Sequence, residues 1–165
     1  MGVRQAVLVK SRGRIMKFFW MAAAVLFFSA VSSAETPRDV VDKLFDAMRR
    51  GDGAAIAALV EEGARLDRLQ KDGTLKHGAF ADWISWVDQQ QEGDANEQIF
   101  GVKILQASPE FATVWAPFVI HYKGKLAGCG INQFTLAKSQ DGWRILYGID
   151  MPYKGDCSTY RSQFE

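Results

Sequence analysis

The sequence predicts an α+β domain in which a helical N-terminal half is followed by a curved antiparallel sheet. Two observations lead to this prediction. Apolar residues recur at helical spacing up to about residue 91, and from about residue 97 they alternate with polar ones. Short turn-forming stretches then divide the alternating part into hairpins, at 108–110, 123–125 and 139–142. Helices followed by consecutive hairpins indicate an α+β layer fold.

The helical half is predicted to contain three helices and one short strand. The first helix begins after Thr36, a natural N-cap, with Pro37 in its first position, and Gly51 ends it. Its apolar stripe is formed by Val40, Val41, Leu44, Phe45 and Met48. The other elements are a helix over 54–60, a short strand over 64–69 and a helix over about 78–91.

Four long strands are expected to form the sheet, over about 97–106, 111–122, 127–138 and 142–150. They contain internal breakers, namely Gly101, Pro117, Gly128, Gly130 and Gly148. Glycine and proline inside strands are typical of bulges and sharp bends, so we expect strong curvature.

The turns set a register that sorts strand residues onto two faces. Pairing Phe118 with Gly130 and Phe134 with Tyr147 turns Asp150 away from the helices, although a one-residue bulge would exchange part of these assignments. No predicted helix covers the other face, and an uncovered apolar patch is typical of an interface. We therefore expect a homodimer through Trp115, Val119, Ile131 and Leu146. The alternative is a scatter of tolerated surface apolar residues.

Small residues on the helix-covered face leave room for a pocket for a small apolar or aromatic ligand. We expect it to be lined by Trp86, Phe118, Asn132 and Tyr147, with hydrogen bonding inside the core as the alternative role of the last two. Asp67 is the only candidate catalytic residue, because a carboxyl with a raised pKa can transfer protons; otherwise it is a solvated strand residue. His77 and His121 are expected at the surface or an interface, and no pair of ionisable groups is expected to converge inside.

The first 34 residues have the pattern of a cleaved signal peptide. The apolar run Phe18–Val31 is 14 residues long, shorter than the roughly 20 that span a bilayer, and the small residues Ser32, Ser33 and Ala34 follow it. We expect translation to start at Met16 and cleavage to leave residues 35–165 as a single periplasmic or secreted domain. An uncleaved membrane anchor is the alternative.

Charge and cysteine content narrow the function classes. Residues 35–165 carry 15 Lys and Arg against 19 Asp and Glu, which argues against nucleic-acid partners and against membrane binding after cleavage. Two cysteines and two histidines are too few and too scattered for a zinc motif, so we expect no metal and no cofactor. In an oxidising compartment Cys129 and Cys157 can form one disulfide, or remain two buried thiols.

The order of elements, ending in Asp141-Gly142-Trp143-Arg144-Ile145, resembles the nuclear-transport-factor-2-like superfamily in its SnoaL-like and lumazine-binding-like branches. Arg49-Arg50-Gly51-Asp52 before an alanine-rich helix adds to the resemblance. Cys129-Gly130 with Gly155-Asp156-Cys157 resembles an exported subgroup that carries a cysteine pair. The resemblance implies a cone-shaped fold with three helices over the concave side of the sheet.

The resemblance implies few catalytic residues. Steroid-isomerase-like relatives use a tyrosine on the first helix, where this chain has Phe45. Epoxide-hydrolase-like relatives use a paired aspartate and arginine, but Asp67 and Arg68 are adjacent and are expected to face opposite ways. We expect an exported small-molecule-binding or accessory domain, because no ionisable pair is expected inside. The alternatives are a cofactor-free isomerase, hydrolase or cyclase, and an interaction module with a filled cone.

Overall fold

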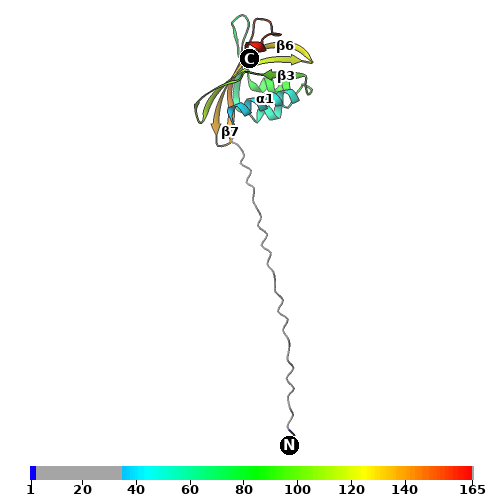
Figure 1. Ribbon diagram of the computed structural model, residues 1–165, viewed down its shortest axis with the longest axis vertical. Coiled ribbons are helices and arrows are strands. Elements are labelled where there is room, and N and C mark those ends of the chain that lie inside the picture. The colour runs from blue at the N-terminus through cyan, green and yellow to red at the C-terminus, as the bar shows by residue number, and fades with distance from the viewer. Residues whose placement is uncertain (3–34, 165) are drawn as a thin grey trace. The chain divides into compact units, whose positions relative to one another are not determined.

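The computed structural model describes residues 1–2 and 35–164, and the latter belong to one compact unit, Ser33–Glu165. Residues 3–34 lie outside the described part of the chain, and with them the expected start at Met16 and the expected cleavage site after Ala34. In residues 35–164, three α-helices cover one face of a curved, unclosed seven-stranded sheet (Figure 1). The predicted α+β class is confirmed.

Helix α1 (Pro37–Arg50) is the best predicted element, because all of its signals are local. Thr36 accepts a hydrogen bond from the Asp39 amide, and the Asp39 carboxylate accepts one from the Thr36 amide in return. Gly51 ends the helix in the left-handed conformation, with φ 68°. The apolar stripe is buried, so α1 is held against the sheet by its side chains as well as by its caps.

Helices α2 (Gly53–Ala57) and α3 (Phe80–Val87) are both shorter than predicted. Helix α2 ends early because strand β1 (Val60–Leu69) already begins at Val60, which pairs with Ile145. Helix α3 begins late because Gly78 is hydrogen-bonded to β1: its carbonyl accepts from the Leu66 amide at 3.2 Å. Tertiary pairing thus overrides the helical pattern at both ends.

The strand order is β2-β1-β7-β6-β5-β3, with β4 also paired to β5. Strands β5, β6 and β7 form the predicted antiparallel hairpins, whereas β1 joins the sheet parallel to β7. Figure 1 shows these long strands bending around α1. The long strands are β5 (Phe111–Tyr122), β6 (Lys125–Ser139) and β7 (Gly142–Pro152), and β2 is the short strand Leu75–Lys76.

The predicted strand over 97–106 is two strands, β3 (Ala95–Ile99) and β4 (Lys103–Ser108). Both pair with β5, β3 along its second half and β4 along its first. Gly101 lies at the break with φ 53°, a conformation that side-chain-bearing residues rarely adopt. The glycine therefore marks the bend that lets one segment follow a strongly curved partner.

A bulge in β7 corrects part of the predicted register. Leu136 pairs with Ile145 as expected, but Thr135 pairs with Tyr147 because β7 carries one extra residue at this point. From there onward the faces exchange. Asp150 pairs with Asn132 and shares the helix-covered face with it, while Tyr147 lies on the opposite face. The expectation that Asp150 points outward is therefore wrong.

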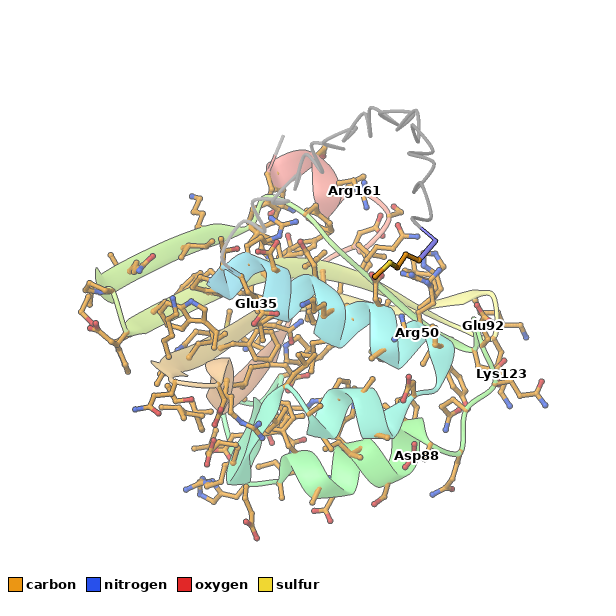
Figure 2. All side chains as sticks on the ribbon, turned by 90° about the horizontal axis from the view of Figure 1, so that it is seen from below. Glu35, Arg50, Asp88, Glu92, Lys123 and Arg161 are labelled. Carbon is orange, nitrogen blue, oxygen red and sulfur yellow. A yellow bond between two sulfur atoms is a disulfide. The ribbon has the colours of Figure 1, made fainter. Side chains whose placement is uncertain are left out.

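The segment after β7 crosses the face of the sheet opposite the helices. A disulfide joins Cys157 to Cys129 of β6, with 28 residues of separation and a Cα–Cα distance of 5.5 Å. The segment ends in the 3₁₀ helix η1 (Arg161–Gln163), where Arg161 lies over the ring of Phe100. In Figure 2, Arg161 marks η1, which lies far from α2 and α3. The predicted disulfide is present, and this end of the outer face has a cover that the sequence did not predict.

Candidate functional site

A cavity of about 280 Å³ lies between the helices and the sheet. Helix α1 contributes Leu44 and Phe45 to it, and α3 contributes Phe80 and Trp83. The sheet contributes a mixed wall of apolar and ionisable side chains: Leu66, Asp67, Arg68, Glu97, Asn132, Phe134 and Asp150. The segment before α3 completes its rim with Lys76, His77, Gly78 and Ala79, and Asp82 of α3 also reaches it. The cavity is therefore mostly apolar on the helix side and mixed on the sheet side, where its ionisable groups are concentrated.

Glu97 of β3 and Asn132 of β6 form the polar centre of this cavity. The Asn132 amide nitrogen Nδ2 donates to Glu97 Oε1 at 2.6 Å, and the Asn132 side chain is only 6% exposed. Burial raises the pKa of Glu97 to about 8; the bond from Asn132 opposes this shift and the nearby Asp150 charge adds to it. At neutral pH Glu97 is therefore protonated and can donate a hydrogen bond as well as accept one.

Asp150 of β7 lies beside this pair and is held by Arg68 of β1. Arg68 Nε donates to Asp150 Oδ1 and Oδ2 at 2.9 and 2.8 Å, and Arg68 Nη2 lies 2.6 Å from Oδ2. The two strands run side by side in the same direction, and Arg68 pairs in register with Asp150. The parallel β1–β7 pairing thus places an ion pair next to a neutral carboxyl in one cavity.

Asp67 is the centre of a separate hydrogen-bond cluster at the cavity edge, and it is only 2% exposed. Its Oδ2 accepts from Arg65 Nη2 at 2.6 Å and from the Tyr147 hydroxyl at 3.1 Å, and its Oδ1 accepts from the Gly78 amide at 3.2 Å. His77 Nδ1 lies 3.3 Å from Oδ2.

The pKa of Asp67 reflects these partners. Desolvation favours the neutral acid, but the hydrogen bonds from Arg65, Gly78, His77 and Tyr147 outweigh it and lower the pKa to about 2. Asp67 is therefore a fixed carboxylate at neutral pH. A raised pKa, which proton transfer by Asp67 requires, is not what this environment produces.

The four expected pocket residues are dispersed. Asn132 lines the cavity, whereas Trp86 lies outside it, with its ring 6.1 Å from that of Tyr122. Phe118 is buried beside Ile99 of β3 and is not part of the cavity wall. Tyr147 approaches from the other face and bonds to Asp67. Trp83, one turn before Trp86, is the tryptophan that lines the cavity.

Ionisable groups do converge on the cavity, against the expectation from sequence. Asp67 and Arg68 both line it although they are neighbours in β1, against the expectation that only one of them could. His77 also lines it, since the segment 76–79 runs along β1. Among the described residues, no group of three or more Cys, His, Asp or Glu is placed to hold a metal ion.

Sequence reasoning missed Glu97, and one signal for it was available. Glu97 and Ile99 have the same parity in β3, and Ile99 packs against the core. A carboxylate at a core-facing parity is a candidate buried acid. Asp150 had no comparable signal, because its direction depends on a bulge that no local residue pattern specifies.

The fold and the cavity define a nuclear-transport-factor-2-like domain with a mixed polar and apolar interior. The chain belongs to the family described as "putative lumazine-binding", whose sequence profile matches residues 32–148. No curated protein matches the chain in sequence.

Solved structures from other proteins have the same fold. A nuclear-transport-factor-2-like protein with a cystatin-like fold from Novosphingobium aromaticivorans has a TM-score of 0.58 at 16% identity, over 78% of this chain and 86% of its own. A domain of cystatin-like fold from Nostoc punctiforme has a TM-score of 0.57 at 17% identity, over 72% and 75%. A protein described as a putative scytalone dehydratase, also from Novosphingobium aromaticivorans, has a TM-score of 0.57 at 13% identity, over 70% and 80%.

Proposed function

We propose that residues 35–165 form an exported domain that binds a small, partly aromatic molecule in the cavity under α1 and α3. The observation that carries this proposal is a neutral carboxyl, Glu97, inside a cavity of about 280 Å³ with an aromatic wall. Ligand sites typically combine mostly apolar walls with a few fixed polar groups. An interaction module with a filled interior would leave no such cavity.

The polar centre specifies what part of the ligand it would hold. Glu97 Oε1 accepts from Asn132, so the protonated Oε2 is free to donate into the cavity. Its partner in the ligand is then a hydrogen-bond acceptor, such as a carbonyl oxygen or an aromatic ring nitrogen. Above about pH 8 Glu97 loses this proton, so affinity for an acceptor ligand is expected to fall there.

A panel of aromatic carbonyl and nitrogen-heterocyclic compounds tests the proposal on the full chain expressed for export. Binding is followed by the change in tryptophan fluorescence, to which Trp83 in the cavity wall contributes, at pH 6 and pH 9. Asn132→Leu and Glu97→Leu are expected to weaken binding at least tenfold, and Glu92→Gln, an exposed control, to leave it unchanged. Equal affinity in the Leu variants and the parent protein would refute the proposal.

A second candidate function is cofactor-free proton transfer, and the pKa of Glu97 favours it specifically. A group that titrates near pH 8 is suited to give or take a proton at physiological pH, and the Asp150 carboxylate, which Arg68 holds beside it, can face a positive charge that develops on the substrate. One structural neighbour with this fold is itself described as a putative scytalone dehydratase. Glu97→Gln then abolishes turnover while ligand binding persists. If Glu97→Gln loses ligand binding and the parent protein shows no turnover, the results support the binding function alone.

We further propose export, with residues 1–34 as the signal peptide. A disulfide is compatible with an oxidising compartment, and no helix in the described part of the chain is long and apolar enough to cross a bilayer. N-terminal sequencing of protein recovered from the periplasm is expected to begin at Glu35. A mature chain that begins at Met1 or Met16 contradicts it.

The proposed homodimer now rests on a smaller patch than the sequence predicted. Trp115 is 50% and Leu146 38% exposed on the outer face, and Val119 lies next to Cys129 in the pairing of β5 with β6. Ile131 lies further along, where the C-terminal segment meets the sheet. Sedimentation equilibrium of the full chain measures the association directly.

A further inference from the structure

The outer face of the sheet has a second cavity, of about 500 Å³, under the C-terminal segment. Its floor is formed by three apolar side chains from adjacent strands: Leu69 of β1, Met151 of β7 and Ile131 of β6. Its other side is formed by Tyr153, Tyr160 and Phe164 of the segment after β7. The Glu97 cavity lies on the opposite face, so the two cavities are separated by the sheet.

This cavity is held open by contacts that do not fill it. The disulfide between Cys129 and Cys157 and the hydrogen bond from the Tyr153 amide to the Cys129 carbonyl, 2.8 Å long, fix the segment on the sheet. The aromatic rings pack on each other, with 4.6 Å between the centroids of Tyr153 and Tyr160 and 5.1 Å between those of Tyr160 and Phe164. Met151 below them remains 43% exposed, so apolar surface is left uncovered beneath a segment that is fixed on the sheet.

The polar groups around this cavity indicate the charge of its ligand. Lys154 and two glutamines, Gln70 and Gln163, line it, and none of the described residues that line it is acidic. The positive charge of Lys154 contributes slightly to the lowered pKa of Asp72 in the β1–β2 turn, whose carboxylate accepts hydrogen bonds from the amide and hydroxyl of Thr74. Among the described residues, the wall of this cavity therefore has one cation and no anion, which is complementary to a ligand with an apolar chain and an anionic head.

We propose that this second cavity binds one single-chain carboxylate amphiphile of the fatty-acid type, with its chain against Leu69, Ile131 and Met151 and its head at Lys154. The volume lies within the range of roughly 300–1,000 Å³ that small-molecule sites occupy. A second copy of the chain is the less suitable occupant, because Tyr160 and Phe164 stand between the floor and a flat partner. The proposal is independent of the ligand in the Glu97 cavity.

Isothermal titration calorimetry of the delipidated full chain with dodecanoate, below its micelle concentration, tests the proposal. We expect one dodecanoate per chain and at least tenfold weaker binding of dodecyltrimethylammonium, with the uncharged dodecanol in between. Lys154→Gln is expected to weaken dodecanoate binding about threefold to fivefold, the usual effect of removing one exposed ion pair. Lys138→Gln, an exposed lysine at the far end of β6, is the matched control and is expected to have no effect.

Two further variants locate the site. Met151→Trp puts a larger side chain into the cavity at a partly exposed position and is expected to reduce binding at least tenfold, whereas Glu97→Gln on the opposite face leaves it unchanged. Since Lys154→Gln changes only an exposed side chain, it decides the question even if Met151→Trp fails to fold. Equal binding of the cationic and anionic probes, loss of binding in Glu97→Gln, or a dimer that Met151→Trp dissociates would each overturn the proposal.

Discussion

Asp67 is a buried carboxylate whose pKa is lowered, and this makes a clear prediction for stability. Folding lowers its pKa from 3.8 to about 2, so its ionised form stabilises the fold above pH 3.8 and this contribution is lost as the pH falls through about 2. Asp67→Asn removes the charge that Arg65 and the Gly78 amide bind. We expect a lower unfolding temperature at pH 7 and a smaller difference between variant and parent at pH 2.

Thermal unfolding followed by circular dichroism at pH 2, 4 and 7 measures this effect. The matched control is Asp141→Asn, an exposed residue in the β6–β7 turn, which is expected to change the unfolding temperature little at any pH. If Asp67→Asn is no more destabilising at pH 7 than Asp141→Asn, the hydrogen-bond cluster does not stabilise the fold.

The pKa of Glu97 shifts in the opposite direction from that of Asp67. Its pKa rises from 4.5 to about 8 on folding, so the folded state binds the proton more tightly and stability falls as the pH rises from about 4.5 to about 8. Glu97→Gln keeps the shape and the bond to Asn132 without a titrating group. The urea-unfolding free energy of the parent is therefore expected to drop by roughly 1–4 kcal/mol between pH 5 and pH 9 relative to the variant. Parallel pH profiles for the two proteins would show that Glu97 is not a buried acid.

At this scale the sequence located Asp67 but assigned it the chemistry that Glu97 has. A sequence shows which residues can titrate, whereas the sign of a pKa shift depends on burial and on hydrogen-bond donors from distant strands. Asp67 receives bonds from Tyr147, 80 positions away, and Glu97 from Asn132, 35 positions away. Neither partner can be assigned before the register of the sheet is known.

Strand β7 is the element in which local pattern and structure differ most. The alternation of 142–150 correctly predicts a strand, but the bulge near Leu146 depends on how β7 pairs with both β6 and β1. The same bulge pairs Gly148 with Phe134 and turns it toward the core, where helix α3 packs on the sheet. A methyl group built there lies 2.8 Å from Leu66 Cδ1, 3.0 Å from Phe80 Cζ and 3.2 Å from Phe134 Cδ1.

Gly148→Ala is therefore expected to destabilise the protein by about 1–3 kcal/mol, because three core side chains have to move. Gly128→Ala on β6 is the matched control, since its methyl group would meet only Ile120, at 3.7 Å. The control is expected to be neutral or stabilising by up to about 1 kcal/mol. Equal unfolding free energies for both variants in urea would contradict the close packing at Gly148.

The C-terminal segment depends on its disulfide more than on regular structure. Only η1 within it is helical, and Cys157 is tied to Cys129 across 28 positions. Closing a ring of this size in the unfolded chain is worth about 3–4 kcal/mol in the chain-entropy account. The double variant Cys129→Ser with Cys157→Ser is expected to lose about this much, measured by urea unfolding. Reduction of the disulfide in the parent protein is expected to lower the free energy of unfolding by the same amount. A loss seen only in the double variant would indicate a packing defect caused by the serine substitutions.

For the whole molecule, the order of elements could be predicted and the long-range pairing of β1 with β7 could not. The helices and the β5–β6–β7 hairpins follow from caps, turns and alternation along adjacent residues. The parallel pairing of β1 with β7 joins residues about 80 positions apart, and no residue pattern in either strand indicates that the other is its partner. That pairing brings Asp67, Arg68 and Asp150 to the Glu97 cavity. The position of the cavity between helices and sheet could therefore be predicted from the sequence, but its ionisable groups could not.

The outer apolar patch leads to the prediction for the assembly of the molecule. Trp115 is half exposed near the middle of β5, and large aromatic side chains at the centre of an interface typically contribute 2 kcal/mol or more. Trp115→Lys would place a charge there and is expected to weaken dimerisation at least about thirtyfold. Sedimentation equilibrium across a hundredfold range of concentration measures it, with Leu75→Lys, an equally exposed apolar residue on the far edge strand β2, as the control. A parent protein that is monomeric throughout, or two variants that dissociate alike, would assign the patch no role in self-association.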